Sequence, residues 1–198
     1  MIPLKDHQTD AVSLFGISAH GIIVYHSVGT GKTLTSIACV NVYPDKKIIF
    51  VTPSSVLNQF EDEIKKYLKN NHGYKLYTYA KFVNKLEDNQ IPKHCIVVLD
   101  EAHKCKSPNT KTSKYILKYC RKYAFKTLFL TATPFVNFPW DIVPLINTIN
   151  VDTNLPVSTN KFKQMFYRKS RSQPYELKII NQCLFTNATN SLVSIYTN

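Results

Sequence analysis

The sequence lacks the features that mark membrane, secreted and zinc-binding proteins. No apolar run approaches the roughly 18 residues that a membrane helix needs. The first residues show no basic stretch followed by a long apolar core, which is the layout of a secretory signal. The 5 cysteines form no Cys-x-x-Cys pair, so free thiols are favoured over a zinc site. We expect a soluble, intracellular chain with no membrane partner.

Acidic residues are scarce as well. The chain has 13 Asp and Glu against 25 Lys and Arg, a net charge of +12, and the basic residues are spread along it. This balance favours a polyanionic partner such as nucleic acid, with a merely solvated basic surface as the alternative. At 198 residues the chain fits one domain and leaves no room for a second of full size.

Apolar, β-branched runs recur along the chain and predict strands at residues 21–25, 47–52, 75–79, 95–100 and 126–131. Helical patterns lie between them, and the clearest covers residues 54–68, where apolar residues recur at three- and four-residue steps. Alternation of strands and helices predicts an α/β fold with a parallel sheet covered by helices on both faces. In such a fold the ligand site lies at the carboxyl ends of the strands.

The pattern weakens beyond residue 150. Residues 151–173 are polar and basic around Phe162, Phe166 and Tyr167, so a surface helix followed by a linker is favoured over a nucleic-acid contact. A short strand-like run follows at residues 177–185, and we assign it no function. We therefore predict one lobe over residues 1–150 and a basic linker or C-terminal extension over residues 151–198.

A glycine-rich loop follows the first predicted strand and opens a helix near Lys32. Glycines allow backbone N–H groups to turn toward a phosphate, and the helix N-terminus adds positive potential. Lys32 would neutralise the β- and γ-phosphates of ATP, and the Thr33 hydroxyl would coordinate Mg²⁺. The predicted nucleotide contacts are Ser27, Val28, Gly29, Thr30, Gly31, Lys32 and Thr33.

An acidic pair closes the fourth predicted strand. Asp100 is placed to hold Mg²⁺ together with Thr33, and Glu101 to orient and deprotonate the attacking water. A solvated acidic pair is the alternative. His103 follows in the run Asp-Glu-Ala-His and would relay the nucleotide state through Thr131 and Thr133, although a lone histidine is more often structural.

Two further positions bear on the nucleotide. Gln8 lies upstream of the loop and could read an adenine edge with its amide, although a lone surface glutamine is the simpler interpretation. His26 occupies the place where the general phosphate-loop pattern has its first glycine. The phosphate loops of helicases do not require glycine at this position. The mismatch therefore favours a helicase among the phosphate-loop proteins, and the predicted nucleotide site stands.

These motifs resemble those of the superfamily 2 helicases and translocases, and within them the Snf2-like branch. Residues 51–60 together with residues 63–66 look like its motif Ia, and Thr78-Tyr79 looks like the motif before the acidic box. Residues 130–137 look like its Thr-Ala-Thr-Pro motif with the following Phe-Val-Asn. Residues 24–33 are similar to the phosphate loop of large-DNA-virus members, such as the poxvirus nucleoside triphosphatase I and the helicase-like subunit of the early transcription factor.

The resemblance implies a RecA-like lobe over residues 1–150, a Gln8 contact to adenine, and nucleic-acid backbone contacts at Thr52 and Pro53. It also implies hydrolysis at Asp100 and Glu101. It further implies DNA in preference to RNA as the track, viral RNA polymerase or transcription machinery as a partner, and a location in the virion or host cytoplasm.

The sequence departs from the family pattern at one point. The enzymes of this family need a second RecA-like lobe, whose arginines complete the ATP site. The Gln-x-x-Gly-Arg-x-x-Arg pattern that carries these arginines does not occur in this sequence. We therefore expect the ATP-binding lobe of a DNA-dependent ATPase, slow or inactive alone and completed in cis or in trans. The alternative is a non-catalytic module that binds nucleotide or nucleic acid on a larger complex. A P-loop kinase or transporter ATPase shares only the phosphate loop.

Overall fold

The chain folds around a six-stranded sheet in the order β3-β2-β4-β5-β1-β8. The computed structural model describes residues 3–69, 73–133, 139–152, 154–169, 177–179 and 193–196. All neighbouring strands of this sheet pair in parallel. The strands are β1 (Gly21–His26), β2 (Ile48–Thr52), β3 (Tyr74–Thr78), β4 (Ile96–Leu99), β5 (Lys126–Thr131) and β8 (Val193–Tyr196). The α/β class and the parallel sheet are confirmed.

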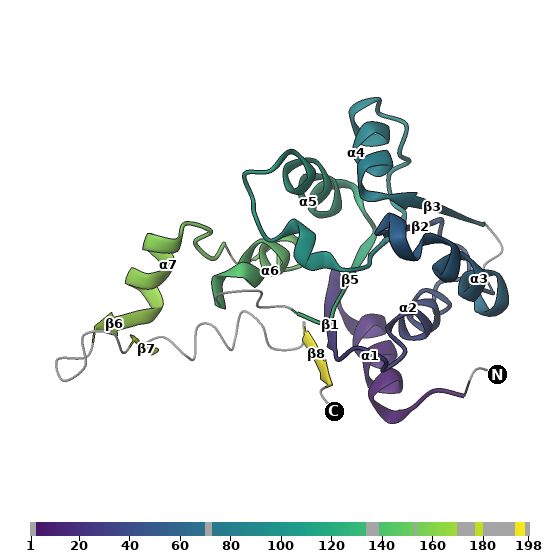
Figure 1. Cartoon of the computed structure of the whole chain (residues 1–198), viewed down its shortest axis with the longest axis horizontal. Helices are drawn as coiled ribbons and strands as arrows, with labels where there is room; N and C mark the ends of the chain where they lie inside the picture. Colours follow the sequence, from purple (N-terminus) through teal and green to yellow (C-terminus); the bar gives the residue numbers. More distant parts are fainter. Residues whose placement is uncertain are drawn as a thin grey trace.

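Helices cover both faces of the sheet (Figure 1). One face carries α1 (Asp6–Ile17), α2 (Lys32–Val40) and α3 (Leu57–Tyr67). The other carries α4 (Tyr79–Glu87), α5 (Lys111–Tyr123) and α6 (Val143–Ile149). Short 3₁₀ turns are η1 (Ser54–Val56), η2 (Ala102–Cys105) and η3 (Pro139–Ile142). The predicted helix at residues 54–68 is thus a 3₁₀ turn followed by α3.

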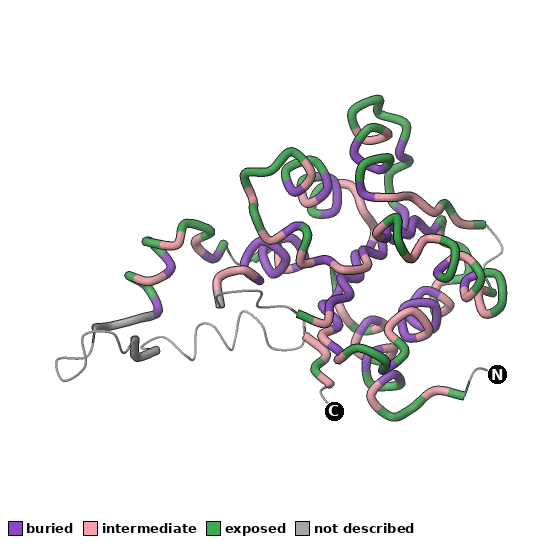
Figure 2. Tube along the Cα trace, in the orientation of Figure 1, coloured by how far each residue is buried: buried purple, intermediate pink, exposed green. Residues whose placement is uncertain are grey.

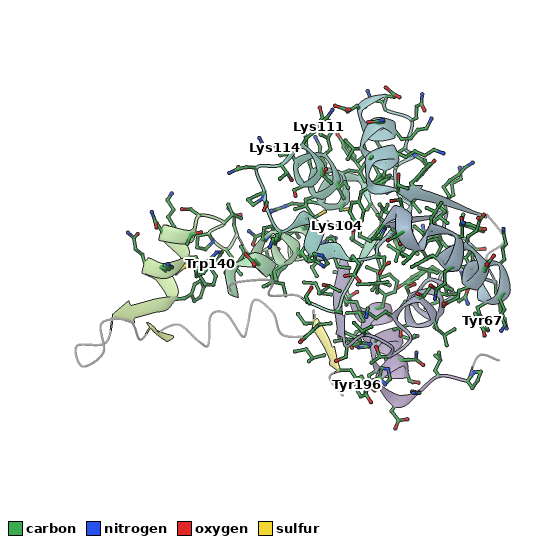
Figure 3. All side chains as sticks on the ribbon, viewed as in Figure 1. Tyr67, Lys104, Lys111, Lys114, Trp140 and Tyr196 are labelled. Carbon is green, nitrogen blue, oxygen red and sulfur yellow. The ribbon has the colours of Figure 1, made fainter. Side chains whose placement is uncertain are left out.

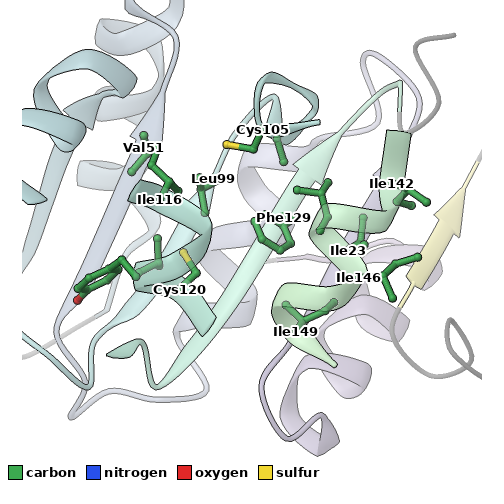
Figure 4. Close-up of a cluster of buried hydrophobic side chains, with 14 of the residues drawn as sticks. Ile23, Val51, Leu99, Cys105, Ile116, Cys120, Phe129, Ile142, Ile146 and Ile149 are labelled. Atoms are coloured by element: carbon green, nitrogen blue, oxygen red, sulfur yellow. The ribbon is translucent and has the colours of Figure 1, made fainter. Parts of the chain in front are cut away.

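Two hydrophobic cores lie on opposite faces because successive residues of a strand point to opposite sides. In β1, Ile22 and Val24 join the core beneath α1, α2 and α3, whereas Ile23 joins the core beneath α4, α5 and α6. Figure 4 shows Ile23 in the second core with Phe129 and Leu99 from neighbouring strands. The central strands are buried on both faces, as Figure 2 shows. This accounts for their continuous apolar runs.

A buried lysine fixes α1 against the sheet. The ammonium of Lys126, at the start of β5, donates hydrogen bonds to the carbonyls of Phe15, Gly16 and Ser18 at the end of α1. The last carbonyls of a helix lack intrahelical partners and carry partial negative charge, so a cation stabilises them. This contact holds α1, which carries Gln8, beside β1 and the loop that follows it.

The segment beyond residue 150 contributes to both the sheet and a core. β8 pairs with β1, which the sequence reasoning did not predict. The expected surface helix is α7 (Thr159–Phe166), but Phe162 and Phe166 are only 2% and 1% exposed and pack in the core beside Trp140. The idea that these two rings contact nucleic acid is therefore wrong. β6 (Tyr167–Lys169) and β7 (Leu177–Ile179) form a separate antiparallel pair.

Several sequence predictions lie partly outside the described residues. The predicted run at residues 177–185 is described only at β7, and the Thr-Ala-Thr-Pro motif of residues 130–137 only up to Thr133. The boundary at residue 150 stays a prediction. Within the described ranges, no helix is long and apolar enough to cross a membrane. Four cysteines of these ranges, Cys39, Cys95, Cys105 and Cys120, are buried free thiols.

Candidate nucleotide-binding site

The glycine-rich loop and the acidic pair meet at one edge of the sheet. The loop follows β1 and the acidic pair follows β4, while β5 lies between these two strands. Because all three strands are parallel, their carboxyl ends share an edge. The sheet therefore brings together residues that lie some way apart along the chain, at the place where α/β proteins bind ligands.

The loop has the backbone conformation that its glycines permit. Gly29 and Gly31 have φ values of 79° and 81°, in the left-handed region that side chains disfavour. A Cβ at Gly31 would also stand 2.8 Å from the amide nitrogen of Gln8. The Thr30 hydroxyl donates to the Ser27 carbonyl at 2.7 Å and closes the loop, whereas Val28 lies at its tip and is 81% exposed. The loop is a compact turn whose outer side is open to a ligand.

Lys32 is folded back onto the loop that precedes it. Its ammonium donates to the carbonyls of His26 and Ser27 at 3.0 and 3.1 Å. Partial burial lowers the pKa of Lys32, and the charges of Glu101 and Asp100 act in the opposite direction. A bound phosphate would replace the two carbonyls as the partner of Lys32.

Gln8 is not a lone surface glutamine. It is 3% exposed, and its amide nitrogen donates to the carbonyls of Thr30 and Gly31 at 3.4 and 3.3 Å. Its amide oxygen accepts a hydrogen bond from the Lys5 backbone at 2.9 Å. In this structure the side chain braces the phosphate loop, and its predicted contact with adenine stays a prediction.

A ring cluster also joins the loop to β8. The rings of His7 and Tyr196 stack at 3.8 Å, and the His7 ring nitrogen lies 3.3 Å from the Thr30 carbonyl. His26 Nε2 lies 3.0 Å from the Ser194 hydroxyl, and the Ser27 amide donates to the Tyr196 carbonyl. Sequence reasoning missed this cluster because a four-residue strand has no distinctive pattern and its partner, β1, lies at the other end of the chain.

His26 is neutral near pH 7. It is fully buried, and burial, followed by the charges of His7 and Lys32, lowers its pKa to about 4. Its Nδ1 atom has no hydrogen-bond partner within the described part of the chain. The bulky ring thus fits where the general loop pattern has glycine because it packs into the β8 contact as an uncharged group.

Asp100 is held from two neighbouring elements. The Thr52 hydroxyl, at the end of β2, donates to its Oδ2 atom at 2.9 Å, and the buried Tyr79 hydroxyl donates to its carbonyl at 2.7 Å. Burial raises the pKa of Asp100, whereas the Thr52 hydrogen bond lowers it. Thr52 is fully buried, so its predicted contact with nucleic acid is not supported by its position here. Pro53 is half-buried, and its predicted contact stays a prediction.

Glu101 and His103 form a pair beside the Thr-Ala-Thr-Pro motif. His103 Nδ1 lies 3.1 Å from Glu101 Oε2 and 3.5 and 3.4 Å from the hydroxyls of Thr131 and Thr133. Glu101 has φ 53° and ψ 49°, a left-handed conformation that costs energy in a residue with a Cβ. The predicted neighbours of His103 are thus brought together, and its relay role stays a prediction.

Comparison with known protein families identifies two matching domains. The SNF2-related domain matches residues 72–194, and the res subunit of the type III restriction enzymes matches residues 1–91. The first match includes the acidic pair, Thr131 and Thr133, and ends at the second residue of β8. The second includes Gln8, the phosphate loop and Thr52.

Similar proteins come from large DNA viruses. A putative ATP-dependent RNA helicase of Acanthamoeba polyphaga mimivirus is 34% identical over 196 residues, which are 98% of this chain and 42% of the relative. The termination factor NPH-I homolog of African swine fever virus is 26% identical over 194 residues, 84% of this chain and 28% of the relative. The chain therefore spans less than half the length of these relatives.

A solved structure shares the fold. The SWI2/SNF2 ATPase core of Sulfolobus solfataricus, determined in complex with dsDNA, superposes with a TM-score of 0.76 at 20% identity. The superposition covers 99% of this chain and 44% of that one. The likeness extends over the whole sheet, including the C-terminal segment that carries β8.

Proposed function

The chain belongs to the SNF2-related family of helicase-like ATPases, and from this we propose that it is the ATP-binding first lobe of a DNA-dependent translocase. One observation carries the proposal. The phosphate loop after β1 and the acidic pair after β4 lie at the same edge of the sheet, where the carboxylates of Glu101 and Asp100 act to raise the pKa of Lys32. A phosphate cradle and a general base are thus within reach of one ligand.

The residues divide the chemistry between them. Lys32 exchanges its two carbonyl partners for phosphate oxygens, and the turned backbone of the loop holds the remaining phosphate charge. Glu101 orients the attacking water and accepts its proton, and His103, 3.1 Å away, holds the Glu101 carboxylate in place. Gln8 and the ring cluster at β8 keep the loop in its conformation.

The donors at this edge fit Mg²⁺. Asp100 offers a carboxylate and Thr33, in the first turn of α2, offers a hydroxyl, and both are the hard oxygen ligands that this ion prefers. When bound, Mg²⁺ neutralises charge on the β- and γ-phosphates. Thr52 orients Asp100 for this task, and desolvation of the carboxylate strengthens its attraction for a cation.

The proposal includes a second RecA-like lobe, supplied in cis or in trans. In related phosphoryl-transfer sites an arginine from a second element contributes about 10³ to 10⁵ in rate, so these 198 residues should hydrolyse ATP slowly by themselves. The Sulfolobus structure with dsDNA supports DNA as the track, whereas the name of the mimivirus relative favours RNA. The termination-factor relative supports a link to viral transcription, in the virion or host cytoplasm.

Calorimetric titration of the purified chain with MgATP tests the proposal. We expect saturable binding that Lys32→Ala abolishes, because the variant loses the cation that replaces loop carbonyls with phosphate. The matched control is Lys47→Ala, an exposed lysine just before β2 and hence at the opposite edge of the sheet. Equal affinity in wild type and Lys32→Ala would refute the proposal.

The alternative is a module that binds ligands without turnover. Hydrolysis that rises with added DNA would exclude it, whereas MgATP binding without hydrolysis, even with a second lobe added in trans, would favour it. The net charge of +12 suits both possibilities, so only turnover separates them.

A further inference from the structure

Helix α5 presents an unusually one-sided charge pattern. Its inner face is buried through Ser113, Ile116, Tyr119 and Cys120. Its exposed basic residues are Lys111, Lys114, Lys118, Arg121 and Lys122. At 3.6 residues per turn these five fall within an arc of about 100°, and the helix contains no Asp or Glu. We call these five residues the α5 basic face; Lys111 and Lys114 are seen on the outer side of the helix in Figure 3.

This face is not the usual solvated surface of a helix. Lys111, Lys114, Lys118 and Lys122 are spaced three or four residues apart, so like charges repel along it. Lys111 and Lys114 also lie in the first turn, where the helix dipole disfavours cations. Within the described ranges, the one ion pair of this face joins Lys111 to Glu87 at 2.9 Å. By contrast, α3 interleaves Glu61, Asp62 and Glu63 with its lysines, and Glu61 pairs with Lys65.

Aromatic rings border the α5 basic face. Tyr115 is 40% exposed, and with Lys118 it lines a hollow of about 330 Å³ that also contains Lys93 and Tyr123. The Lys93 ammonium lies 4.9 Å from the centre of the Tyr123 ring. Lysines spaced along a line with an accessible ring among them match a nucleic-acid strand, whose phosphates repeat along its length and whose bases can stack. An acidic protein segment would use the lysines but not the exposed ring.

We propose that the α5 basic face and Tyr115 form a contact for single-stranded nucleic acid, separate from the motif Ia segment at the end of β2. The phosphates would lie along the lysines and a base would stack on Tyr115. α5 begins after the acidic pair and ends just before β5. The bound nucleic acid would therefore run from the edge of the sheet that carries the phosphate loop and the acidic pair toward the opposite edge. This inference rests on the nucleic-acid part of the proposed function.

Fluorescence anisotropy with a labelled single-stranded oligonucleotide, measured across a range of salt concentrations, tests the contact. The triple variant K114Q/K118Q/K122Q should lower the slope of log affinity against log salt by about 2, because each lost phosphate contact on a single strand contributes about 0.7. The control K47Q/K69Q/K75Q removes the same charge from exposed positions outside both α5 and the motif Ia segment and should keep the wild-type slope.

A Tyr115 variant distinguishes a contact that stacks a nucleic-acid base from a surface that attracts nucleic acid by charge alone. Tyr115→Ala should weaken single-strand binding about 5- to 100-fold, the range for loss of one base stack, and leave duplex binding nearly unchanged. MgATP affinity should be the same in all variants, which also shows that they fold.

Three results would overturn the inference. The two triple variants could lose affinity equally, the slope could be unchanged in K114Q/K118Q/K122Q, or the α5 variant could lose binding only to a poly-glutamate peptide, which would assign an acidic protein partner instead. In each case wild-type nucleic-acid and MgATP binding would leave the proposed function standing. Its nucleic-acid part fails only if the wild-type chain binds no nucleic acid.

Discussion

The two halves of the ATP site are held in place in different ways. The acidic half, Asp100 to His103, depends on the ends of adjacent strands: Thr52 from β2 and Thr131 from β5. The phosphate-loop half depends on the two ends of the described chain, with Gln8 from α1 near the N-terminus and Tyr196 from β8 near the C-terminus. Strand order therefore builds the acidic half, whereas contacts between distant segments build the loop half.

This difference has a consequence for function. The acidic half contains the proposed catalytic groups, and a change there should affect turnover while the fold persists. Apart from Lys32, the loop half contains a buried neutral histidine and a ring stack, and a change in these rings should affect stability first. Variants in each half can test whether the two roles are truly separate.

The largest effect should come from Glu101→Gln in the acidic half. Loss of the general base should reduce DNA-stimulated ATP hydrolysis about 10²- to 10⁴-fold, because a positioned base contributes that much. MgATP affinity and the midpoint of thermal unfolding should change little. Glu61→Gln on α3 is the control, since Glu61 pairs only with a surface lysine of its own helix in the described structure. Loss of nucleotide binding in Glu101→Gln would contradict the idea that the acidic half acts on turnover alone.

The next effect is the loss of stability at low pH that His26 causes in the loop half. Because the pKa of His26 falls from 6.5 in the unfolded chain to about 4 in the fold, the unfolded state binds the proton more tightly. The contribution of neutral His26 to the free energy of unfolding is complete above pH 6.5 and is lost as the pH falls to about 4. The difference between the two pKa values corresponds to about 3 kcal/mol in the free energy of unfolding. His26→Gln should remove this part of the acid sensitivity, as measured by urea unfolding from pH 7 to pH 4.

The exposed His20 provides the control for this measurement. His20→Gln should keep the wild-type slope of unfolding free energy against pH. If His26→Gln and wild type lose stability in parallel between pH 6.5 and pH 4, the neutral state of His26 does not couple to folding, and the loop half loses its distinguishing property.

The smallest effect should come from Tyr196→Ala, which removes the ring stacked on His7. We expect a loss of about 1 kcal/mol in unfolding free energy, typical of one aromatic pair. Tyr196→Phe keeps a ring and should stay within a few tenths of wild type. The backbone hydrogen bond from Ser27 to residue 196 does not depend on the side chain, so β8 should remain in the sheet. Equal stability of Tyr196→Ala and wild type would show that the stack contributes nothing to the loop.

Much of the fold and part of the site follow from local pattern. The five predicted strands appear within about a residue of their predicted bounds, since each is a continuous apolar run between polar segments. The loop glycines adopt the left-handed conformation that their position required. Thr52 shows the limit of this reasoning: sequence resemblance suggested a nucleic-acid contact, but β2 lies beside β4, and this turns its hydroxyl toward Asp100.

The sequence by itself determined the alternation of strands and helices, the glycines of the phosphate loop and the presence of a carboxylate pair at a strand end. These depend on hydrophobic period and backbone preference, which act within a few residues. Only the tertiary structure decided that Gln8 and Tyr196 would both meet the loop, that His26 would be neutral, and that Thr52 would orient Asp100. Such contacts depend on strand order and burial, which arise when distant segments exclude water together.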